Sequence, residues 1–315
     1  MPQVTTKILI TGGAGYIGST LVPIILSKGY QVTVIDNFMY RQIGLAGSVN
    51  HPKFNLIYGD VRDSALLQTE ISKADIVLPL AAIVGAPACA KDPIMASSIN
   101  KDSTLKIFDL LSKDQQIIMP TTNSAYGSGG DQNLCDEKSP MNPISLYAKD
   151  KVFIENKLMN HQNATSFRLA TVFGISPRMR LDLLVNNFVY RAITDQYVVL
   201  FEGHFKRNYV HILDVCKAFL FAIENPQKVV GQIFNFGLSD ANISKIELCA
   251  TIQRLIPDFV FFESAINKDP DQRNYIVSNQ KIEAIGLKAE ISLEQGIDEL
   301  IKGLPMFTRF EFTNL

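Results

Sequence analysis

Apolar residues form two alternating patterns in the first half of the chain. Short apolar runs predict strands, and segments with apolar residues three or four positions apart predict amphipathic helices. Ile17, Leu21, Ile24 and Ile25 make one such helical stripe. The predicted strands are residues 7–10, 31–35, 55–58, 75–80, 116–120 and 165–170. Strands that alternate with helices in this way predict an α/β fold built on a doubly wound parallel sheet.

The pattern is looser after Gly174. Strands and helices still alternate there, and we expect them at 198–200, 213–224, 233–236 and 244–255. We therefore predict two parts. Residues 1–174 hold the parallel sheet, and residues 175–315 form a smaller C-terminal region from which the chain crosses back to the sheet.

A glycine-rich turn, Thr11–Gly18 with the sequence TGGAGYIG, follows the first predicted strand and opens the first predicted helix. Gly13, Gly15 and Gly18 match the dinucleotide fingerprint, whose glycines permit a tight turn, close approach to a pyrophosphate and close helix–strand packing. The phosphates would bind the free N–H groups at the positive end of the helix. The alternative is a glycine turn that binds nothing. The turn predicts a Rossmann-type nucleotide-binding domain over residues 1–174.

Asp36 ends the second predicted strand, about 18 residues past Gly18. A carboxylate at this place can accept hydrogen bonds from the adenosine ribose, and it would repel the extra phosphate of NADP. Arg41 could serve NADP, although an exposed loop arginine is more often only solvated. We therefore predict NAD as the cofactor.

Tyr147 and Lys151 lie four residues apart on a predicted helix, so they share one face. A tyrosine hydroxyl, with a pKa near 10, is a poor base at neutral pH. A neighbouring ammonium group and the positive nicotinamide ring would favour the tyrosinate. Such a base can take the proton of a substrate alcohol as hydride leaves its carbon. A packed tyrosine beside a solvated lysine is the alternative.

The polar segment 120–127, PTTNSAYG, follows the fifth predicted strand. Ligands of open parallel sheets bind beyond the carboxyl ends of the strands. A hydroxyl in this segment can hydrogen-bond the reacting alcohol and the catalytic tyrosine. By itself the segment would be read as a Ser/Thr-rich turn.

Composition narrows the choice of partners and compartment. The chain has 315 residues, 47% of them hydrophobic and 19% charged, which is typical of a globular protein. Its net charge of -1, without basic blocks, argues against nucleic acid. The four cysteines and four histidines are scattered, so we predict reduced thiols, a cytoplasmic location and no metal site. The longest apolar stretch is too short to span a bilayer.

These motifs occur in a characteristic order along nearly the whole chain. Together with Asp36-Asn37, the run 59–63 (GDVRD) and Leu80-Ala81-Ala82, they resemble the extended short-chain dehydrogenase/reductases that act on nucleotide sugars. Residues 81–87 and 168–180 are similar to the bacterial GDP-heptose 4-dehydrogenases and the broader 4-epimerase group. The resemblance implies a nucleotide-diphosphate sugar as substrate, with a GDP-linked sugar favoured.

The resemblance and the fingerprint assign three groups of site residues. The catalytic group is Thr122, Tyr147 and Lys151, and Lys151 would also hold the nicotinamide ribose. The implied cofactor-binding residues are Gly12, Gly15, Tyr16, Ile17, Gly18, Asp36, Asn37, Asp60, Val61, Leu80, Ala81, Ala82, Asn100, Tyr147 and Lys151. The implied substrate-binding residues are Asn123, Ser124, Thr171, Arg180, Arg207 and Arg273, with Arg207 and Arg273 on the diphosphate.

One departure separates reaction types. The 4,6-dehydratases of the family place an Asp-Glu pair directly after the catalytic Thr, and this chain has Asn123 and Ser124. An amide and a hydroxyl are poor proton donors and acceptors near pH 7, so dehydration is disfavoured. We predict NAD-dependent oxidation at C4 of a nucleotide-linked sugar, by a 4-dehydrogenase or a 4-epimerase. The alternatives are a 4,6-dehydratase and a non-catalytic NAD-binding regulator.

The resemblance also implies a homodimer. In the family, the helix that carries the Tyr-Lys pair and the helix near 99–111 pair across a two-fold axis into a four-helix bundle. Phe153, Ile154 and Leu158 extend an apolar stripe along the first of these helices. A stripe of this kind is equally compatible with burial in the core of one chain.

Overall fold

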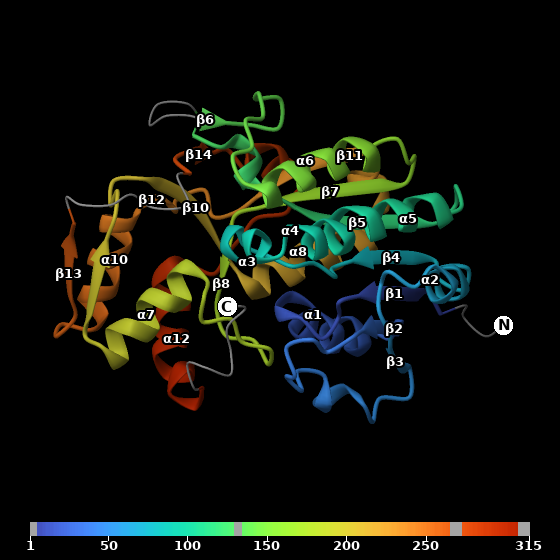
Figure 1. Cartoon of the computed structure of the whole chain (residues 1–315), viewed down its shortest axis with the longest axis horizontal. Coiled ribbons are helices and arrows are strands. Elements are labelled where there is room, and N and C mark those ends of the chain that lie inside the picture. The colour runs from blue at the N-terminus through green and yellow to red at the C-terminus, as the bar shows by residue number, and fades with distance from the viewer. Residues whose placement is uncertain (1–4, 129–133, 265–272, 308–315) are drawn as a thin grey trace.

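The computed structural model describes residues 5–128, 134–264 and 273–307. Its centre is a sheet of seven strands that are all parallel, in the order β11-β7-β5-β4-β1-β2-β3 (Figure 1). The strands are β1 (Lys7–Thr11), β2 (Gln31–Asp36), β3 (Phe54–Tyr58), β4 (Ile76–Pro79), β5 (Gln116–Thr122), β7 (Ala164–Leu169) and β11 (Gln232–Phe236). The predicted parallel sheet is confirmed.

Strand order reverses beside β1. The chain runs from β1 through β2 to β3 on one side, then crosses to β4 and continues through β5 and β7 on the other. Inner strands are buried on both faces, which explains why they appear in the sequence as continuous apolar runs. Edge strand β3 is largely exposed. Such a reversal leaves a crevice at the carboxyl ends of the neighbouring strands.

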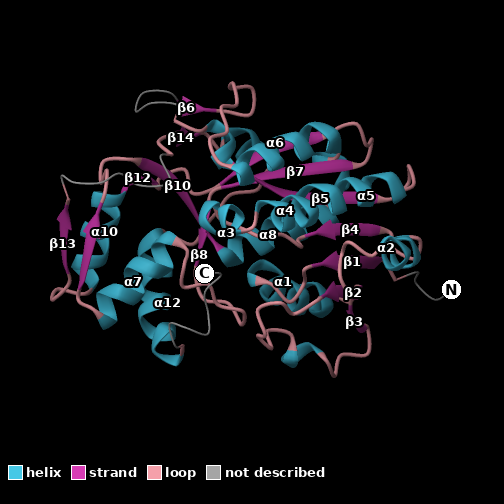
Figure 2. Ribbon diagram, viewed as in Figure 1, coloured by secondary structure: helices cyan, strands magenta, loops and turns pink. Residues whose placement is uncertain are grey.

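Helices cover both faces of the sheet (Figure 2). On one face α1 (Tyr16–Ser27) packs against α8 (Ile212–Glu224), and on the other α5 (Ser103–Leu110) packs against α2 (Ser64–Ile71) and α6 (Leu146–Leu158). Alternate residues of β1 serve the two layers, because Ile8 and Ile10 join the core of the α1 face and Leu9 joins that of the α2 face. The fold is therefore doubly wound, as predicted.

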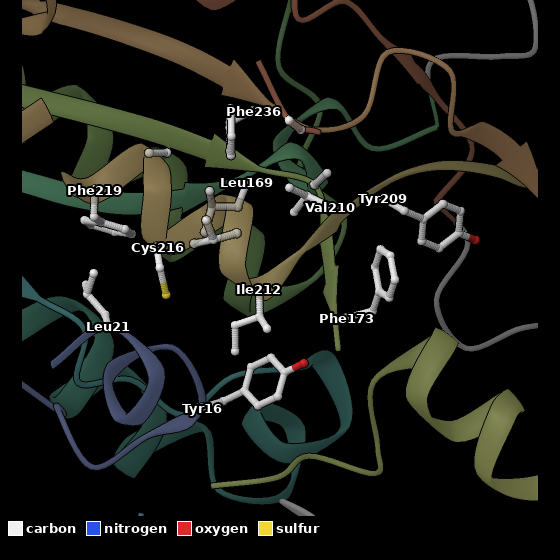
Figure 3. Close-up of a cluster of buried hydrophobic side chains, with 14 of the residues drawn as sticks. Tyr16, Leu21, Leu169, Phe173, Tyr209, Val210, Ile212, Cys216, Phe219 and Phe236 are labelled. Atoms are coloured by element: carbon white, nitrogen blue, oxygen red, sulfur yellow. The ribbon is translucent and has the colours of Figure 1, made fainter. Parts of the chain in front are cut away.

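The first core layer extends into the C-terminal region. Figure 3 shows Leu21 of α1 beside Cys216 and Phe219 of α8, with Phe236 of β11 above them. Helix α8 and strand β11 both follow residue 175, so the chain does return to the sheet.

The rest of the C-terminal region lies beside the sheet, on the left in Figure 1. After β7 the chain enters β8 (Thr171–Phe173), which pairs with β10 (Lys206–His211), and β10 also pairs with β12 (Asn242–Ser244). The region also contains three longer helices and one further parallel pair, and one of its strands pairs with β6, which lies earlier in the chain. These elements are β9 (Tyr197–Leu200) with β13 (Val260–Glu263), β6 (Leu134–Cys135) with β14 (Ile276–Val277), α7 (Leu184–Thr194), α10 (Lys245–Leu255) and α12 (Leu293–Gly303).

The helix predicted near residues 99–111 differs from the structure. It is a composite of α4 (Pro93–Ser97), a π-helical turn (Ser98–Asp102) and α5. π-helical turns are rare and often mark functional sites. The remaining short helices are α3 (Ala86–Lys91), α9 (Pro226–Val229), α11 (Gln280–Ala284) and 3₁₀ turns at 46–48, 123–126 and 304–306. Within the described residues, no helix is long and apolar enough to cross a membrane.

Candidate active site

A cavity of about 560 Å³ opens at the carboxyl ends of the strands, at the point where strand order reverses. Its walls come from both parts of the chain. Residues 1–174 supply the turn after β1, the ends of β2, β4 and β5, and residues 84–88 and 170–172. The start of α6 and several residues of the C-terminal region also contribute, among them Arg207 and Arg273.

The glycine turn forms the floor of this cavity. Gly12 has a φ of 69°, and a Cβ on it would lie 2.5 Å from the backbone of Ala81. A Cβ on Gly18 would collide with the backbone of Gly13. Because Gly18 has no side chain, the two backbones can pack as closely as expected of the last fingerprint glycine. The tight turn thus belongs to Gly12, one residue before the glycines that match the fingerprint. Gly13 packs against Val34 of β2 instead.

Helix α1 begins at this floor without a side-chain cap. Gly15 is its N-cap residue and makes no side-chain hydrogen bond, and Gly15 to Gly18 all line the cavity. Uncapped N–H groups with bare glycine backbone fit a diphosphate. Tyr16 lines the cavity, but its hydroxyl points away and donates to the carbonyl of Gly174 at 2.7 Å. Its ring belongs to the core (Figure 3).

Asp36 lies at the end of β2 with its carboxylate fixed by two backbone groups. It accepts hydrogen bonds from the N–H of Ala14 at 2.9 Å and the N–H of Phe38 at 2.7 Å. Burial raises its pKa above the usual value. Each carboxylate oxygen retains one lone pair for a ribose hydroxyl. Asn37 beside it also lines the cavity.

Asp60 and Val61 form the neighbouring rim. Asp60 is held by Arg62 through two hydrogen bonds, at 2.9 and 2.7 Å, which lower the pKa of its carboxyl to about 2. The opposite wall is the segment Leu80-Ala81-Ala82 after β4. All of these predicted residues therefore converge on one cavity.

Asn100 does not line the cavity, in contrast to the cofactor contact expected for it. It lies in the π-helical turn, buried, and its amide accepts from the N–H of Ile83 and donates to the carbonyl of Ile83, both at 2.8 Å. Asn100 therefore fixes the loop that follows Leu80–Ala82. Its influence on a bound cofactor would be indirect.

Thr122, Tyr147 and Lys151 all line the cavity. Thr122 is the last residue of β5, and α6 begins at Leu146 with Ser145 as its capping side chain. The Lys151 ammonium donates to the carbonyl of Pro120 at 3.2 Å. Burial lowers the pKa of Lys151 to about 8.

The electrostatics of Tyr147 differ from the expectation. Burial raises its pKa to about 12, and the cations that oppose this rise are Arg180 and Arg273 rather than Lys151. The Lys151 ammonium is directed at the Pro120 carbonyl. In the protein alone, Tyr147 is therefore held in its neutral form at pH 7.

Position 123 also differs from the expectation. Ser124 faces the cavity, exchanges hydrogen bonds with Thr122 at 2.9 and 3.1 Å, and receives one from Arg273. Asn123 is 1% exposed, is not part of the lining, and its amide has no hydrogen-bond partner among the described residues. The 3₁₀ turn that begins at Asn123 turns its side chain into the protein, so the predicted substrate contact is not seen.

Among the residues that the structure describes, six cationic and three acidic side chains line the cavity, whereas the whole chain has a net charge of -1. Arg180, Arg207 and Arg273 are among the cations, and Thr171 on β8 also lines the cavity. Arg180 is paired with Asp182 at 2.5 Å. The lining thus has the charge expected for polyanionic ligands such as diphosphates.

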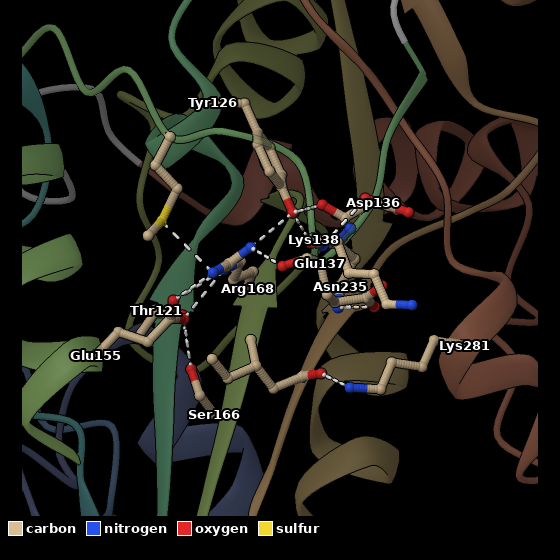
Figure 4. Close-up of polar contacts among 12 residues, drawn as sticks. Thr121, Tyr126, Asp136, Glu137, Lys138, Glu155, Ser166, Arg168, Asn235 and Lys281 are labelled. Carbon is tan, nitrogen blue, oxygen red and sulfur yellow. Dashed lines mark hydrogen bonds and ion pairs between the residues drawn. The ribbon is translucent and has the colours of Figure 1, made fainter. Parts of the chain in front are cut away.

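Two features were missed by the sequence analysis. Arg178 lines the cavity at 3% exposure, two residues from the predicted Arg180. Behind the cavity, Arg168 and Glu155 form a fully buried ion pair at 2.6 Å (Figure 4). Glu155 also accepts hydrogen bonds from Thr121 and Ser166, both at 2.8 Å. The sequence signal for Glu155 was its spacing, because it lies four residues after Lys151 on the same helix, α6.

The fold and this lining define a Rossmann-fold protein whose crevice at the strand ends is lined by the glycine turn, Asp36 and several arginines. The sequence places it further: residues 8–237 match the NAD dependent epimerase/dehydratase family, and the chain belongs to that family. NAD, the predicted cofactor, is the cofactor in the family's name.

Individual relatives carry out different reactions. UDP-glucuronic acid decarboxylase 1 of Arabidopsis thaliana is 26% identical over 309 residues, 94% of this chain and 69% of the relative. UDP-glucose 4-epimerase of Thermotoga maritima, solved with UDP-glucose, superposes with a TM-score of 0.83 at 24% identity, over 96% of this chain and 99% of the other. dTDP-glucose 4,6-dehydratase of Bacillus anthracis, solved with NAD, superposes with a TM-score of 0.81 at 20% identity, over 98% and 99%. At these identities the two structures establish the fold alone.

Proposed function

We propose that the protein oxidises C4 of a nucleotide-linked sugar with NAD, as a 4-dehydrogenase or a 4-epimerase. The observation that carries the proposal is the meeting of Thr122, Tyr147 and Lys151 in one cavity with the glycine turn and Asp36. Bound NAD would supply the hydride acceptor for C4. A protein that only sensed NAD would have no need of this triad.

The residues have separate roles in this proposal. Thr122 hydrogen-bonds the C4 hydroxyl and Tyr147 takes its proton. Because burial holds the Tyr147 pKa near 12, its deprotonation requires nearby positive charge, which Arg180 and Arg273 begin to supply. Lys151 holds the nicotinamide ribose. The cofactor carries the difficult bond change, and the protein orients the reactants.

The C-terminal region would hold the sugar nucleotide. Arg207 and Arg273 line the cavity. A guanidinium suits phosphate because its planar fork donates two parallel hydrogen bonds. GDP-linked sugars are the first to test, given the resemblance of residues 168–180. UDP-linked sugars are the second, given the names of the relatives above.

Dehydration is disfavoured by positions 123 and 124. A 4,6-dehydratase needs an acid to protonate the departing hydroxyl, and Asn123 is both an amide and turned away from the cavity. Ser124 is engaged with Thr122 and Arg273. The keto sugar would therefore keep its C6 oxygen.

Mass spectrometry of products from GDP-, UDP- and dTDP-sugars tests the proposal. A loss of two mass units means 4-dehydrogenation, and unchanged mass with a new NMR spectrum means 4-epimerisation. A loss of eighteen would mean dehydration and would contradict the reasoning from Asn123 and Ser124. Absence of any product with a protein that binds NAD would favour the regulator instead.

We also propose a homodimer, although only one of the three apolar residues named from the sequence, Phe153, is exposed. Ile154 and Leu158 are fully buried in the core of their own chain, so they are not free to form an interface. Phe153 on α6 is 43% exposed and Ile94 on α4 is 86% exposed, and the two helices are joined by a hydrogen bond from Ser97 to Asp150. Light scattering should give about twice the 35.0 kDa chain mass. A single-chain mass at micromolar concentration would contradict the proposal.

A further inference from the structure

Arg178 is the buried cation that the proposed chemistry leaves without a role. Its side chain is 3% exposed and lines the cavity, although it belongs to the C-terminal region. The contacts of its backbone show which part of the cavity lies next to Arg178.

Residues 174–178 are tied alongside the first turn of α1. The Ser176 hydroxyl donates to the carbonyl of Tyr16 at 2.7 Å and lies 3.0 Å from the hydroxyl of Ser19. The N–H of Arg178 donates to that same Ser19 hydroxyl at 3.2 Å. With the bond from Tyr16 to Gly174, these contacts form a strap, residues 174–178, that fixes Arg178 beside the uncapped end of α1.

The other side of Arg178 faces the loop after β2. A Cβ on Gly44 would lie 3.2 Å from the Cβ of Arg178, so loop and strap are in close contact. The Arg178 guanidinium stacks over the ring of Tyr40, 4.2 Å from its centroid. Tyr40 lines the cavity in the same loop as Asn37. Arg178 therefore joins two sides of the cavity, because its backbone contacts the first turn of α1 and its guanidinium contacts the loop that follows Asp36.

We propose that Arg178 binds the diphosphate of the dinucleotide cofactor from the side of the C-terminal region, and that the strap locks the cofactor in place between turnovers. This inference rests on the proposed function only in taking the cavity as the NAD site. The N–H groups of α1 contact one side of the diphosphate, and the guanidinium contacts the other. Tyr40 holds the guanidinium plane in position through its ring.

Electrostatics agree with this arrangement. Burial and the neighbouring Arg180 lower the pKa of Arg178 to about 10, so the charged guanidinium is less stable here than in water. A bound diphosphate would relieve that cost. Arg178 would thus gain more from an anion than an exposed arginine does.

Binding of NAD⁺, ADP-ribose and adenosine to the full chain tests the proposal by calorimetry, without any sugar substrate. Adenosine has no phosphate, so it separates phosphate contacts from contacts to the adenosine. Arg178→Gln should weaken NAD⁺ and ADP-ribose about 10- to 100-fold, the range for a lost charged hydrogen bond, and leave adenosine within about twofold. Release of NADH, followed by its fluorescence, should accelerate by a similar factor.

The matched control is Arg191→Gln. Arg191 lies on α7, outside the cavity lining, and is paired with Asp195 at 3.0 Å. It should leave all three affinities within about twofold. Should Arg178→Gln fail to fold, Arg178→Lys takes its place, since a lysine keeps the charge but loses the planar fork. It should still weaken ADP-ribose several-fold.

Two outcomes would overturn the inference. Equal affinities for wild type and the Arg178 variants would show that Arg178 does not bind the cofactor. An equal loss for adenosine and ADP-ribose would place its effect on the adenosine rather than the diphosphate. If wild type itself bound neither NAD⁺ nor ADP-ribose, the proposed function would fail, and that result is separate from both.

Discussion

The proposed role of Lys151 requires a buried charge, and this charge should lower the free energy of unfolding. Lys151 is 4% exposed, and burial lowers its pKa from 10.5 to about 8. This lowering of the pKa corresponds to roughly 3 kcal/mol at pH 7, where the group is charged in both folded and unfolded states. Lys151→Met removes the charge and should recover that free energy of unfolding.

Part of the gain is offset by a lost hydrogen bond. The Pro120 carbonyl accepts from Lys151 at 3.2 Å, and leaving this half-buried acceptor unpaired costs about 1 kcal/mol. The net expectation is that Lys151→Met is more stable than wild type by about 2 kcal/mol at pH 7. The proposed catalytic rate should fall at the same time, because the ribose of the cofactor loses its partner.

The sign of the pH dependence follows from the direction of the shift. Below pH 8 the folded protein bears the full cost of the buried charge. As pH rises toward 10.5, the folded state loses the proton before the unfolded state does, so the cost falls to about 2 kcal/mol at pH 9 and below about 1 at pH 10. The advantage of Lys151→Met should therefore shrink to about 1 kcal/mol at pH 9 and vanish near pH 10.

Urea unfolding of both proteins at pH 7, 9 and 10 measures this difference, and other titrating groups cancel because both proteins carry them. Lys149→Met, on the exposed side of α6, is the control and should change stability by less than about 0.5 kcal/mol. A Lys151→Met protein that is less stable than wild type at pH 7, or whose advantage is the same at every pH, would refute the reasoning.

Three further outcomes are expected. Tyr147→Phe should lower kcat about 10²- to 10⁴-fold with nearly unchanged cofactor affinity, and a variant with more than half of wild-type activity would exclude Tyr147 as the base. NAD⁺ should bind at least about tenfold more tightly than NADP⁺ in calorimetry, because the Asp36 carboxylate would repel the extra phosphate, and equal affinity would contradict this. Arg168→Leu should lower the free energy of unfolding by about 3–5 kcal/mol, since it leaves Glu155 buried without its ion pair. Arg168→Leu combined with Glu155→Leu should cost less, and an equal or larger loss would mean that the unpaired charge is not the cause.

The sheet could be predicted from the sequence because each inner strand is buried on both faces. A run such as 116–120 has no polar alternation to confuse it with an exposed edge, and the prediction missed only its polar end. Strand β5 continues to Thr122, since Thr121 and Thr122 pair with Arg168 and Leu169 of β7. Composition gives no signal for that extension, because pairing with a distant strand decides it.

Site residues could be predicted where backbone geometry alone positions them. The glycine turn and the four-residue spacing of Tyr147 and Lys151 are of this kind. Side-chain direction after a strand is different, because it depends on the turn that follows. The 3₁₀ turn at Asn123 buries one side chain and presents the next, Ser124, to the cavity. Arg178 was missed for a related reason, since only the strap brings it beside α1.

The strap also bears on the fate of the hydride. The strap, residues 174–178, contacts α1 through the N–H of Arg178, and Arg180, two residues further along, lines the same cavity. Arg180 also acts electrostatically on Tyr147.

A cofactor held by such a segment would leave only if the segment also moved away from the sugar site. Release of a 4-keto sugar would then strand the reduced cofactor in the protein, whereas return of the hydride to the other face of C4 would restore NAD in place. A locked cofactor therefore favours the 4-epimerase over the 4-dehydrogenase, which is the opposite of what the resemblance to GDP-heptose 4-dehydrogenases suggests. Slow NADH release from wild type that is accelerated in Arg178→Gln would support the locked cofactor, and the mass of the product then decides between the two reactions.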